Sequence, residues 1–496
     1  MVSNSSESAS QTRGSAERPL RVAVIGSGPA GVYAADILTK SERVKSGELT
    51  VSIDLFDRYP APFGLIRYGV APDHPRIKGI ISALHKVLDR GDIRFFGNVD
   101  YGTDLTLEDL TAHYDAVIFA TGALDDAALN IPGIGLEGSF GGADFVSWYD
   151  GHPDVPRDWP LDATEVAVLG NGNVALDVAR MLSKHADDLL VTDIPENVYR
   201  GLKASPVTDV HVFGRRGPAQ IKFTPLELRE LSHSKDVDII LYPEDFEFDA
   251  ASDEAIKTNN QVKTMVNTLT NWLVEQPDEP VKASTASRRL HLHFLHSPVE
   301  IVDSAQTPGR VAGIKFERTE LDGTGNVRGT GEFLEYPVQA VYRAIGYFGS
   351  ALPEVEFDAH RGVIPNSGGR VLDADGAAVP GLYATGWIKR GPVGLIGHTK
   401  GDALETITLL LEDLEALPEA TEPAAESVPA LLESRDVAYT SWDGWLALDE
   451  HEQALGASFD PATVGLSPEQ ELVRERVKVV DREEMVDISR RVDATV

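Results

Sequence analysis

Glycine spacing in one early segment of the chain suits the binding of a dinucleotide. The apolar run Arg21–Ile25 leads into Gly26-Ser27-Gly28-Pro29-Ala30-Gly31 and then into a helical segment. Gly26 permits a tight turn, Gly28 lets a pyrophosphate approach the backbone, and Gly31 lets the helix pack on the strand. The start of the helix then offers free N–H groups to the phosphates.

An acidic residue follows the next predicted strand. The apolar run Val51–Phe56 ends at Asp57, whose carboxylate can accept hydrogen bonds from a ribose. A glycine pattern alone is weak evidence, but this one lies between a strand and a helix, with an acid after the next strand. The segment therefore predicts a dinucleotide site rather than a plain glycine-rich turn.

A second glycine turn follows later in the chain. Glu165–Leu169 is a predicted strand, and Gly170-Asn171-Gly172-Asn173-Val174-Ala175 leads from it into a helix. The next strand, Asp209–Phe213, ends in Gly214-Arg215-Arg216 instead of an acid. Two guanidinium groups suit a 2′-phosphate, whereas a carboxylate would repel it. The second nucleotide is therefore predicted to be NADP rather than NAD; the alternative is that the two arginines are solvated surface residues.

Two such turns in one chain indicate two nucleotides. The usual combination is a permanently held flavin dinucleotide and a nicotinamide nucleotide that visits. Asp115–Gly122 (DAVIFATG) and Gly381–Gly386 (GLYATG) are strands that end in small residues, which let backbone pass close to a cofactor.

The composition of the chain excludes several kinds of site and partner. The chain has 496 residues, a formal net charge of −33 and no Cys. Without Cys it has no disulfide, iron–sulfur cluster or thiolate zinc site. The negative charge argues against nucleic-acid binding, and an apolar run of about 18 residues, as a transmembrane helix needs, is missing. We therefore expect no nucleic acid and no membrane among the partners.

The N-terminal segment and an acidic segment near the C-terminus also allow structural predictions. Residues 1–18 are rich in Ser and have no apolar stretch, which predicts a disordered tail, no secretory signal and a cytoplasmic protein. Residues 405–461 are acidic and include Glu415–Pro429 (EALPEATEPAAESVP), which predicts an exposed linker. Trp442 and Trp445 begin a helical pattern that is predicted to dock on the main body.

Several long motifs occur in order along the chain. They are Pro62–Lys78 (PFGLIRYGVAPDHPRIK), Phe95–Val99 (FFGNV), Gly170–Arg180 (GNGNVALDVAR), Gly214–Pro218 (GRRGP), Thr224–Leu231 (TPLELREL) and Gly386–Gly397 (GWIKRGPVGLIG). Together they resemble one known family, the adrenodoxin-reductase type of ferredoxin–NADP reductase, in particular its bacterial members. The resemblance covers most of the chain from about residue 20.

The resemblance implies an α/β fold of two Rossmann-like dinucleotide-binding domains, with the NADP domain inserted into a discontinuous FAD domain. The FAD domain would comprise residues 19–122 and 347–496, and the NADP domain residues 123–346. FAD contacts carried over from the family are Gly26, Gly28, Ala30, Asp57, Leu65, Val99, Trp387, Gly394, Leu395 and Ile396. NADP contacts carried over are Asn171, Gly172, Asn173, Val174, Arg215, Arg216, Glu227 and Gly394.

The family also places a histidine, here His74, near an acid of the ELREL segment, here Glu230, beside the flavin. These two residues would relay a proton or orient the substrate; alternatively, His74 only holds its loop. Two positions depart from relatives. Asp57 stands where some have Glu, and Ala127 stands near an Arg of some bacterial relatives, which would leave NADP held mainly by Arg215 and Arg216.

Three histidines in a predicted strand raise the question of a metal. His291 and His293 alternate with apolar residues, and His296 follows. Alternation predicts that these side chains lie on the outer face of the strand. Residues two apart can chelate, but no nearby acid or Cys completes a ligand set, so we expect no metal site.

The leading hypothesis is an FAD-dependent reductase that takes hydride from NADPH and passes single electrons to a ferredoxin-like iron–sulfur protein. The iron–sulfur partner rests on the resemblance alone, and we expect a monomer. One alternative is an NADPH-dependent flavin oxidase or monooxygenase, although an FxGxxxHxxxW pattern is missing. Another is a non-catalytic NADP-binding module. A disulfide reductase is excluded because there is no Cys pair, and a glutamate-synthase-type subunit would normally bring Cys for its own cluster. Lys389 and Arg390 are candidates for contact with an acidic partner.

Overall fold

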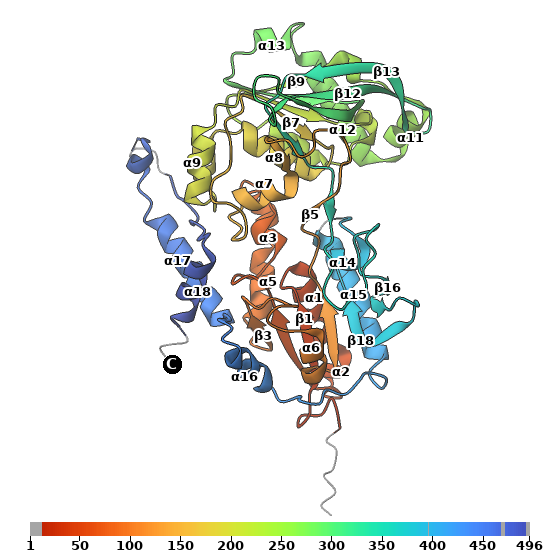
Figure 1. The fold of residues 1–496 in the computed structure, drawn as a ribbon, viewed down its shortest axis with the longest axis vertical. Coiled ribbons are helices and arrows are strands. Elements are labelled where there is room, and N and C mark those ends of the chain that lie inside the picture. Colours follow the sequence, from red (N-terminus) through yellow and green to blue (C-terminus); the bar gives the residue numbers. More distant parts are fainter. Residues whose placement is uncertain (1–11, 395, 468–471, 493–496) are drawn as a thin grey trace, which may run out of the picture.

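The computed structural model describes residues 12–394, 396–467 and 472–492. It has two lobes, each built around a parallel sheet, with a slender connection between them (Figure 1). We call them the first lobe and the second lobe. The C-terminal helices lie along one side of the first lobe (Figure 1).

The first lobe contains a seven-stranded sheet in the order β16-β17-β18-β4-β1-β2-β3. The five strands β18, β4, β1, β2 and β3 run parallel to one another, whereas the pairs β17–β18 and β16–β17 are antiparallel. Buried apolar side chains cover both faces, as parallel sheets require. The strands are β1 (Leu20–Ile25), β2 (Val51–Phe56), β3 (Ile93–Phe96), β4 (Ala116–Phe119), β16 (Asn366–Ser367), β17 (Arg370–Leu372) and β18 (Ala378–Ala384).

The helices of this lobe flank the sheet, and α1 packs against α15 although they are far apart in sequence. They are α1 (Pro29–Thr39), α2 (Glu42–Lys45), α3 (Leu65–Tyr68), α4 (Pro75–Lys78), α5 (Ile81–Leu88), α6 (Leu107–His113), α14 (Trp387–Arg390) and α15 (Ile396–Glu412).

The second lobe contains a six-stranded parallel sheet in the order β6-β14-β7-β8-β10-β9. Its strands are β6 (Ser139–Gly141), β7 (Glu165–Leu169), β8 (Asp209–Phe213), β9 (Val237–Leu241), β10 (Arg288–His293) and β14 (Ala340–Arg343). Its helices are α7 (Gly142–Tyr149), α8 (Asn173–Ser183), α9 (Glu196–Ala204), α10 (Pro225–Leu231), α11 (Ala250–Thr258), α12 (Asn260–Glu275), α13 (Pro280–Ala283) and the short 3₁₀ turns η1 (Ala186–Leu189), η2 (Pro218–Gln220) and η3 (Pro243–Asp245).

The second lobe is an insertion in the first. The chain leaves the first lobe after β4 and returns to it before β16, and on the way β5 (Asp125–Asp126) pairs with β15 (Tyr347–Phe348). The predicted fold class, two parallel dinucleotide-binding folds with one inserted into the other, is confirmed. The predicted domain boundaries at 122/123 and 346/347 lie beside these two short strands.

A small antiparallel sheet covers one face of the second lobe. It consists of β11 (His296–Asp303), β12 (Val311–Leu321) and β13 (Val327–Tyr336). The prediction that His291, His293 and His296 face outward is wrong, because all three side chains are at most 3% exposed. Their face of β10 lies under the small sheet, whose Tyr336 ring is 5.1 Å from that of His293. The alternation along a strand shows which side chains share a face, but it does not show which element covers that face.

The acidic segment 405–461 is not an exposed linker. Its first part belongs to α15, and it also contains α16 (Ser427–Ser434) and α17 (Trp442–Ala457). Between the helices, Leu417 and Ala420 are buried, and the Ala420 N–H donates to Asp115 Oδ1 at 3.1 Å. Most acids of the segment are exposed, although Glu452 is buried, and scattered apolar residues anchor the chain, a pattern that composition alone does not reveal.

The predicted N-terminal tail falls partly outside the described residues, which begin at 12. Within the described part, Arg13 Nη1 donates to the Leu417 carbonyl at 2.8 Å, and Arg18 pairs with Asp115 at 2.6 Å. Residues 12–18 are therefore attached to the first lobe, not disordered.

The C-terminal segment docks through both apolar and charged contacts. Trp445 of α17 is 2% exposed and its ring lies 5.7 Å from Phe63. Glu452 of the same helix, fully buried, receives two hydrogen bonds from Arg67 of α3. After η4 (Pro461–Val464), Lys478 reaches Asp193 of the second lobe at 3.1 Å, and α18 (Arg482–Arg490) follows. The helices in the described ranges do not include one with the length and apolar character to cross a membrane.

Candidate active site

The first glycine turn has the geometry that its spacing predicts. Gly26 adopts φ +110°, and a Cβ there would lie 2.5 Å from the Ala120 carbonyl oxygen. A Cβ at Gly31 would lie 1.9 Å from the Gly26 carbonyl oxygen. At Gly28 the nearest protein atom to such a Cβ is the Gly64 Cα, 3.9 Å away. Gly26 and Gly31 are therefore required by the close packing of the backbone. The space beside Gly28, in contrast, is not filled by protein atoms.

We expect Gly31→Ala to lower the free energy of unfolding by about 1–3 kcal/mol, the usual cost of overpacking. The added methyl group would press on backbone, which cannot rotate away as a flexible side chain can. Urea unfolding followed by circular dichroism measures the change. Unchanged stability would contradict the close packing of α1 on the turn.

Asp57 is held against the same turn. Its carboxylate accepts the Ser27 N–H at 2.9 Å, the Ser27 hydroxyl at 2.5 Å and the Tyr59 N–H at 3.0 Å. Burial raises the pKa of Asp57, and these hydrogen bonds oppose the increase. A carboxylate offers about four acceptor positions, so one remains for a ligand hydroxyl.

Other predicted FAD contacts gather around this edge of the sheet. Val99 is buried and its N–H donates to the Asp57 carbonyl at 2.9 Å. Leu65 begins α3 directly after Gly64, which lies against Gly28. A Cβ at Gly386, the residue before Trp387, would lie 2.6 Å from the Ala30 Cβ. The structure thus brings Ala30, Leu65, Val99 and Trp387 to the first turn.

The remaining predicted FAD contacts precede or begin α15. Gly394 is exposed and adopts φ +89°. Ile396 is the first residue of the helix. The prediction for Leu395 lies outside the described residues.

Unpartnered buried hydroxyl groups lie near Trp387. Among the described residues, Thr385 Oγ1 and Tyr347 Oη are buried without a hydrogen-bond partner, and the Tyr347 ring is 6.0 Å from that of Trp387. A buried polar group left unsatisfied costs about 1–3 kcal/mol, so a partner outside the protein, such as a water or a ligand, is expected for each of these two groups. Together with the space at Gly28, they fit a bound dinucleotide such as FAD.

The second glycine turn repeats the first. Gly170 adopts φ +142°, and a Cβ there would lie 2.2 Å from the Ala344 carbonyl oxygen. A Cβ at Gly172 would meet no described protein atom within 4 Å, so here too the middle glycine leaves open space. The Asn171 carbonyl accepts the Lys222 N–H, and Asn173 Oδ1 accepts the Thr224 N–H at 2.9 Å. Val174 is half-buried against the core of the second lobe.

Arg215 and Arg216 follow β8 without charged partners. Within the described ranges, neither guanidinium has a carboxylate within 4 Å, whereas many other arginines of the chain are paired. The pair lines a cavity of about 340 Å³. The other residues around the cavity are Ser297, Glu317, Thr319, Asn326, Val327 and Gly329. Two unpaired guanidinium groups at the carboxyl edge of a parallel sheet form an anion site.

His74 lies at the contact between the lobes, in a cluster of charged groups. Its Nδ1 is 2.6 Å from Glu230 Oε2, and its Nε2 is 2.8 Å from both Asp177 Oδ1 and Glu227 Oε2. Burial by itself would lower the pKa of His74, but the hydrogen bonds to Asp177 and Glu227 outweigh it and raise the pKa to about 10. His74 is therefore an imidazolium at neutral pH.

The cluster includes residues that the sequence did not single out. Arg180 of α8 lies 2.7 Å from His74 Nε2 and forms two hydrogen bonds with Asp73. Glu227, predicted to contact NADP, belongs to this cluster. Asp177 and Arg180 are three residues apart on one helix, a spacing that brings side chains together, and that signal could have suggested the pair.

Lys389 and Arg390 are engaged within the chain. Lys389 Nζ lies 2.6 Å from Glu405 Oε2, and Arg390 pairs with Asp402, both acids belonging to α15. Lys389 is 6% exposed. These two cations are therefore poorly placed to contact an acidic partner, contrary to the sequence-based hypothesis.

Two parallel sheets with glycine turns, one turn followed by an unpaired arginine pair, define a pyridine nucleotide oxidoreductase with two dinucleotide-binding folds. The family model described as pyridine nucleotide-disulphide oxidoreductase matches residues 20–209. This chain has no Cys, so it cannot carry out the disulphide chemistry of that description.

Relatives that match this chain over almost their full length show which family of pyridine nucleotide oxidoreductases it belongs to. NADPH-ferredoxin reductase FprA of Mycobacterium tuberculosis (strain ATCC 25618 / H37Rv) is 39% identical over 469 residues, which cover 92% of this chain and 99% of the relative. Mitochondrial NADPH:adrenodoxin oxidoreductase of Bos taurus is 38% identical over 468 residues, covering 92% of each chain. A solved structure of Mycobacterium tuberculosis FprA in complex with NADPH matches with a TM-score of 0.83 and 36% identity, over 95% of this chain and 100% of that one. The chain belongs to the family of NADPH-ferredoxin and NADPH:adrenodoxin reductases.

Proposed function

We propose that this protein is an FAD-dependent reductase that oxidises NADPH and passes single electrons to a ferredoxin-like iron–sulfur protein. The observation that carries the proposal is the pair of glycine turns with open space at their middle glycines, of which only the second is followed by two unpaired arginines. The names of the relatives, NADPH-ferredoxin reductase and NADPH:adrenodoxin oxidoreductase, support both the nucleotide and the acceptor class.

In this proposal the first lobe holds FAD. Gly28 and the start of α1 receive the pyrophosphate, and Asp57 accepts a hydrogen bond from the adenosine ribose. Leu65, Val99, Trp387 and Gly394 enclose the rest of the cofactor. When bound, FAD accepts two electrons from NADPH and releases them one at a time to the iron–sulfur partner.

The second lobe holds NADPH. Asn171 to Val174 and the start of α8 face its pyrophosphate, and Arg215 and Arg216 bind its 2′-phosphate. Because residue 127 is Ala and not Arg, Arg215 and Arg216 bind the 2′-phosphate without a further arginine from that position. Gly394 keeps space for the nicotinamide ring, which must reach the flavin for transfer.

His74 and Glu230 hold a proton beside the place where the two nucleotides meet. His74 Nδ1 and Glu230 Oε2 are 2.6 Å apart, and Glu230 is 27% exposed, so a proton on this pair can exchange with solvent. Glu227 and Asp177 keep the imidazole charged and fixed in orientation.

We expect the stabilising effect of His74 to depend on pH. Because folding raises its pKa from the ordinary 6.5 to about 10, the contribution is complete below pH 6.5 and is lost as the pH rises towards 10. The free energy of unfolding of wild type and His74→Gln, measured in urea at pH 6 and pH 10, should differ more at pH 6. An equal difference at both pH values would show that His74 is not charged in the folded protein.

The function is tested by cytochrome c reduction with NADPH, with and without added ferredoxins. We expect NADPH-driven reduction that a ferredoxin accelerates. Oxygen uptake at the same rate without an acceptor would favour the flavin oxidase or monooxygenase, and a yellow protein that reduces no acceptor would favour the NADP-binding module.

The expectations of a monomer and of a cytoplasmic location remain predictions. The relatives include bacterial and mitochondrial proteins. Gel filtration with light scattering would measure the oligomeric state.

A further inference from the structure

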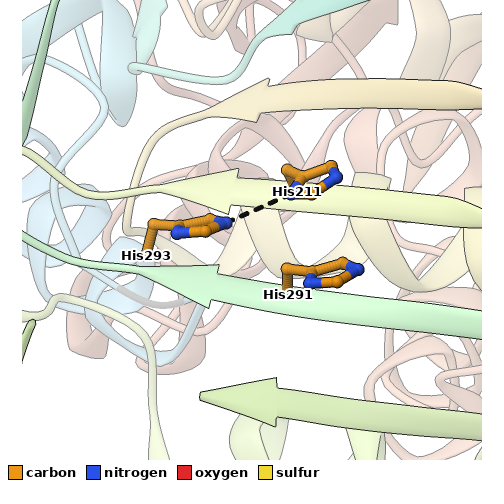
Figure 2. A group of neighbouring side chains, drawn as sticks. All are labelled: His211, His291 and His293. Atoms are coloured by element: carbon orange, nitrogen blue, oxygen red, sulfur yellow. Dashed lines mark hydrogen bonds between the residues drawn. The ribbon is translucent and has the colours of Figure 1, made fainter. Parts of the chain in front are cut away.

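Three histidines meet on one buried face of the second lobe. His211 of β8 lies directly opposite His291 of β10, and His293 is two residues further along β10 (Figure 2). Because strand side chains alternate between faces, all three point to the same side of the sheet. They are buried, with exposed fractions of 9%, 2% and 3% respectively.

Two of the three imidazoles, those of His211 and His293, each turn one ring nitrogen towards the other. His211 Nδ1 and His293 Nε2 are 3.1 Å apart. One ring nitrogen from each of the three histidines can be chosen such that all lie within 4.8 Å of one another. A tetrahedral zinc with Zn–N bonds of about 2.0–2.1 Å needs ligand nitrogens roughly 3.3 Å apart. The nitrogens of His211 and His293, which are 3.1 Å apart, are already near that separation.

The opposite nitrogens of the same rings face carboxylates. His291 Nε2 is 2.8 Å from Asp209 Oδ1, His293 Nδ1 is 3.8 Å from Asp245 Oδ2, and His211 Nε2 is 4.0 Å from Glu165 Oε2. Metal-binding histidines typically have a carboxylate hydrogen-bonded to the far nitrogen, which holds the N–H there and leaves the near nitrogen free to coordinate. His291 has such a bond, to Asp209, whereas the carboxylates behind His293 and His211 lie beyond hydrogen-bond distance.

His211 and His293 already share a hydrogen bond that a metal ion could replace. At 3.1 Å one neutral ring donates an N–H to the unshared pair of the other, and the tautomers decide which ring donates. A metal ion bound between the two near nitrogens would take the place of that shared proton, and each ring would then carry its proton on the nitrogen that faces a carboxylate.

We propose that His211, His291 and His293 bind a late first-row divalent cation of the Zn²⁺ type. Three neutral imidazoles suit such ions better than Mg²⁺ or Ca²⁺. The His291 ring is stacked on that of His211 at 4.1 Å, so it must turn about its Cβ–Cγ bond to coordinate. Tyr242 Oη, 2.8 Å from His291 Nδ1, is placed to become the fourth ligand.

An ion can reach this cluster from solvent. A cavity of about 320 Å³ opens beside it and is lined in part by Tyr242, Asp245 and His293. The site also borders the arginine loop, because the Gly214 N–H donates to the His293 carbonyl at 2.9 Å. A bound ion would link β8 to β10 just before Arg215. We therefore expect the ion to have a structural role.

The test uses the tag-free holoprotein, stripped of metal by a chelator and titrated with Co²⁺ and Zn²⁺. We expect one ion per chain, the visible absorption of tetrahedral Co²⁺, and a rise in Tm on addition of Zn²⁺ that the chelator reverses. Failure of the stripped protein to bind either ion stoichiometrically, or binding without a rise in Tm, would overturn the proposal.

Variants locate the ion. His211→Phe and His293→Phe, which keep a flat ring in place, should lose the bound Co²⁺ while the protein stays yellow. The control His360→Ala, at an exposed histidine, should bind as wild type. His74→Gln should also bind, because Arg180 sits within the His74 cluster and leaves no room for a second cation there. Undiminished binding in both phenylalanine variants would refute the site, and the chelator experiment on wild type remains decisive if either fails to fold.

Discussion

Replacing Gly28 with Val is expected to give a folded but colourless protein. A valine side chain would occupy the space through which a pyrophosphate reaches the backbone, and its Cβ would meet no described protein atom closely, since the nearest, the Gly64 Cα, is 3.9 Å away. Gly28 also has an extended backbone, with φ −66° and ψ 179°, which valine adopts readily. Visible absorption measures the flavin content, and circular dichroism checks the fold.

The second glycine turn offers a matched control for this variant. Gly172 is also the middle glycine of its turn, and a Cβ there meets no described atom within 4 Å. Gly172→Val should therefore keep its flavin but lose reduction by NADPH, in a rapid-mixing experiment without any acceptor. A yellow Gly28→Val protein, or a colourless Gly172→Val protein, would contradict the assignment of FAD to the first lobe and NADPH to the second.

The double substitution of Arg215 and Arg216 by Ala should raise the KM for NADPH by about two orders of magnitude and that for NADH by less than about threefold. Hydrogen bonds to charged groups contribute about 1.5–3 kcal/mol each, and only NADPH carries the 2′-phosphate. Neither guanidinium has a carboxylate partner in the described residues, so removal leaves no buried acid unpaired. Steady-state kinetics with both nucleotides measures the ratio.

The control replaces two other arginines of the second lobe, Arg200 and Arg328, by Ala. Their side chains are 75% and 71% exposed, and each pairs only with a surface acid. This double variant has the same change of net charge and should keep the preference for NADPH. If both double variants lose the preference equally, the effect reflects general electrostatics and not a 2′-phosphate site.

Local signals predicted the backbone geometry of the two glycine turns well. A glycine turn is defined by residues within six positions of one another, and its requirement for positive φ at Gly26 and Gly170 is a property of the backbone there. The arginine pair after β8 could likewise be placed because a parallel strand directs its carboxyl end to the ligand edge. The predicted linker at 405–461 failed because composition does not show which residues are buried: Leu417, Trp445 and the buried acid Glu452 attach this region to the first lobe.

The sequence by itself determined the class of protein, the order of its two dinucleotide folds and the preference of the second for a 2′-phosphate, because each depends on short segments and their chain order. Only the tertiary structure decided which distant groups meet. His74 acquires its charge from acids about 100 and 150 residues away, brought to it by the contact between the lobes. His211 meets His291 and His293 because β8 pairs with β10, and the small sheet buries them. Such meetings depend on strand order and lobe packing, which the spacing of residues along the chain does not encode.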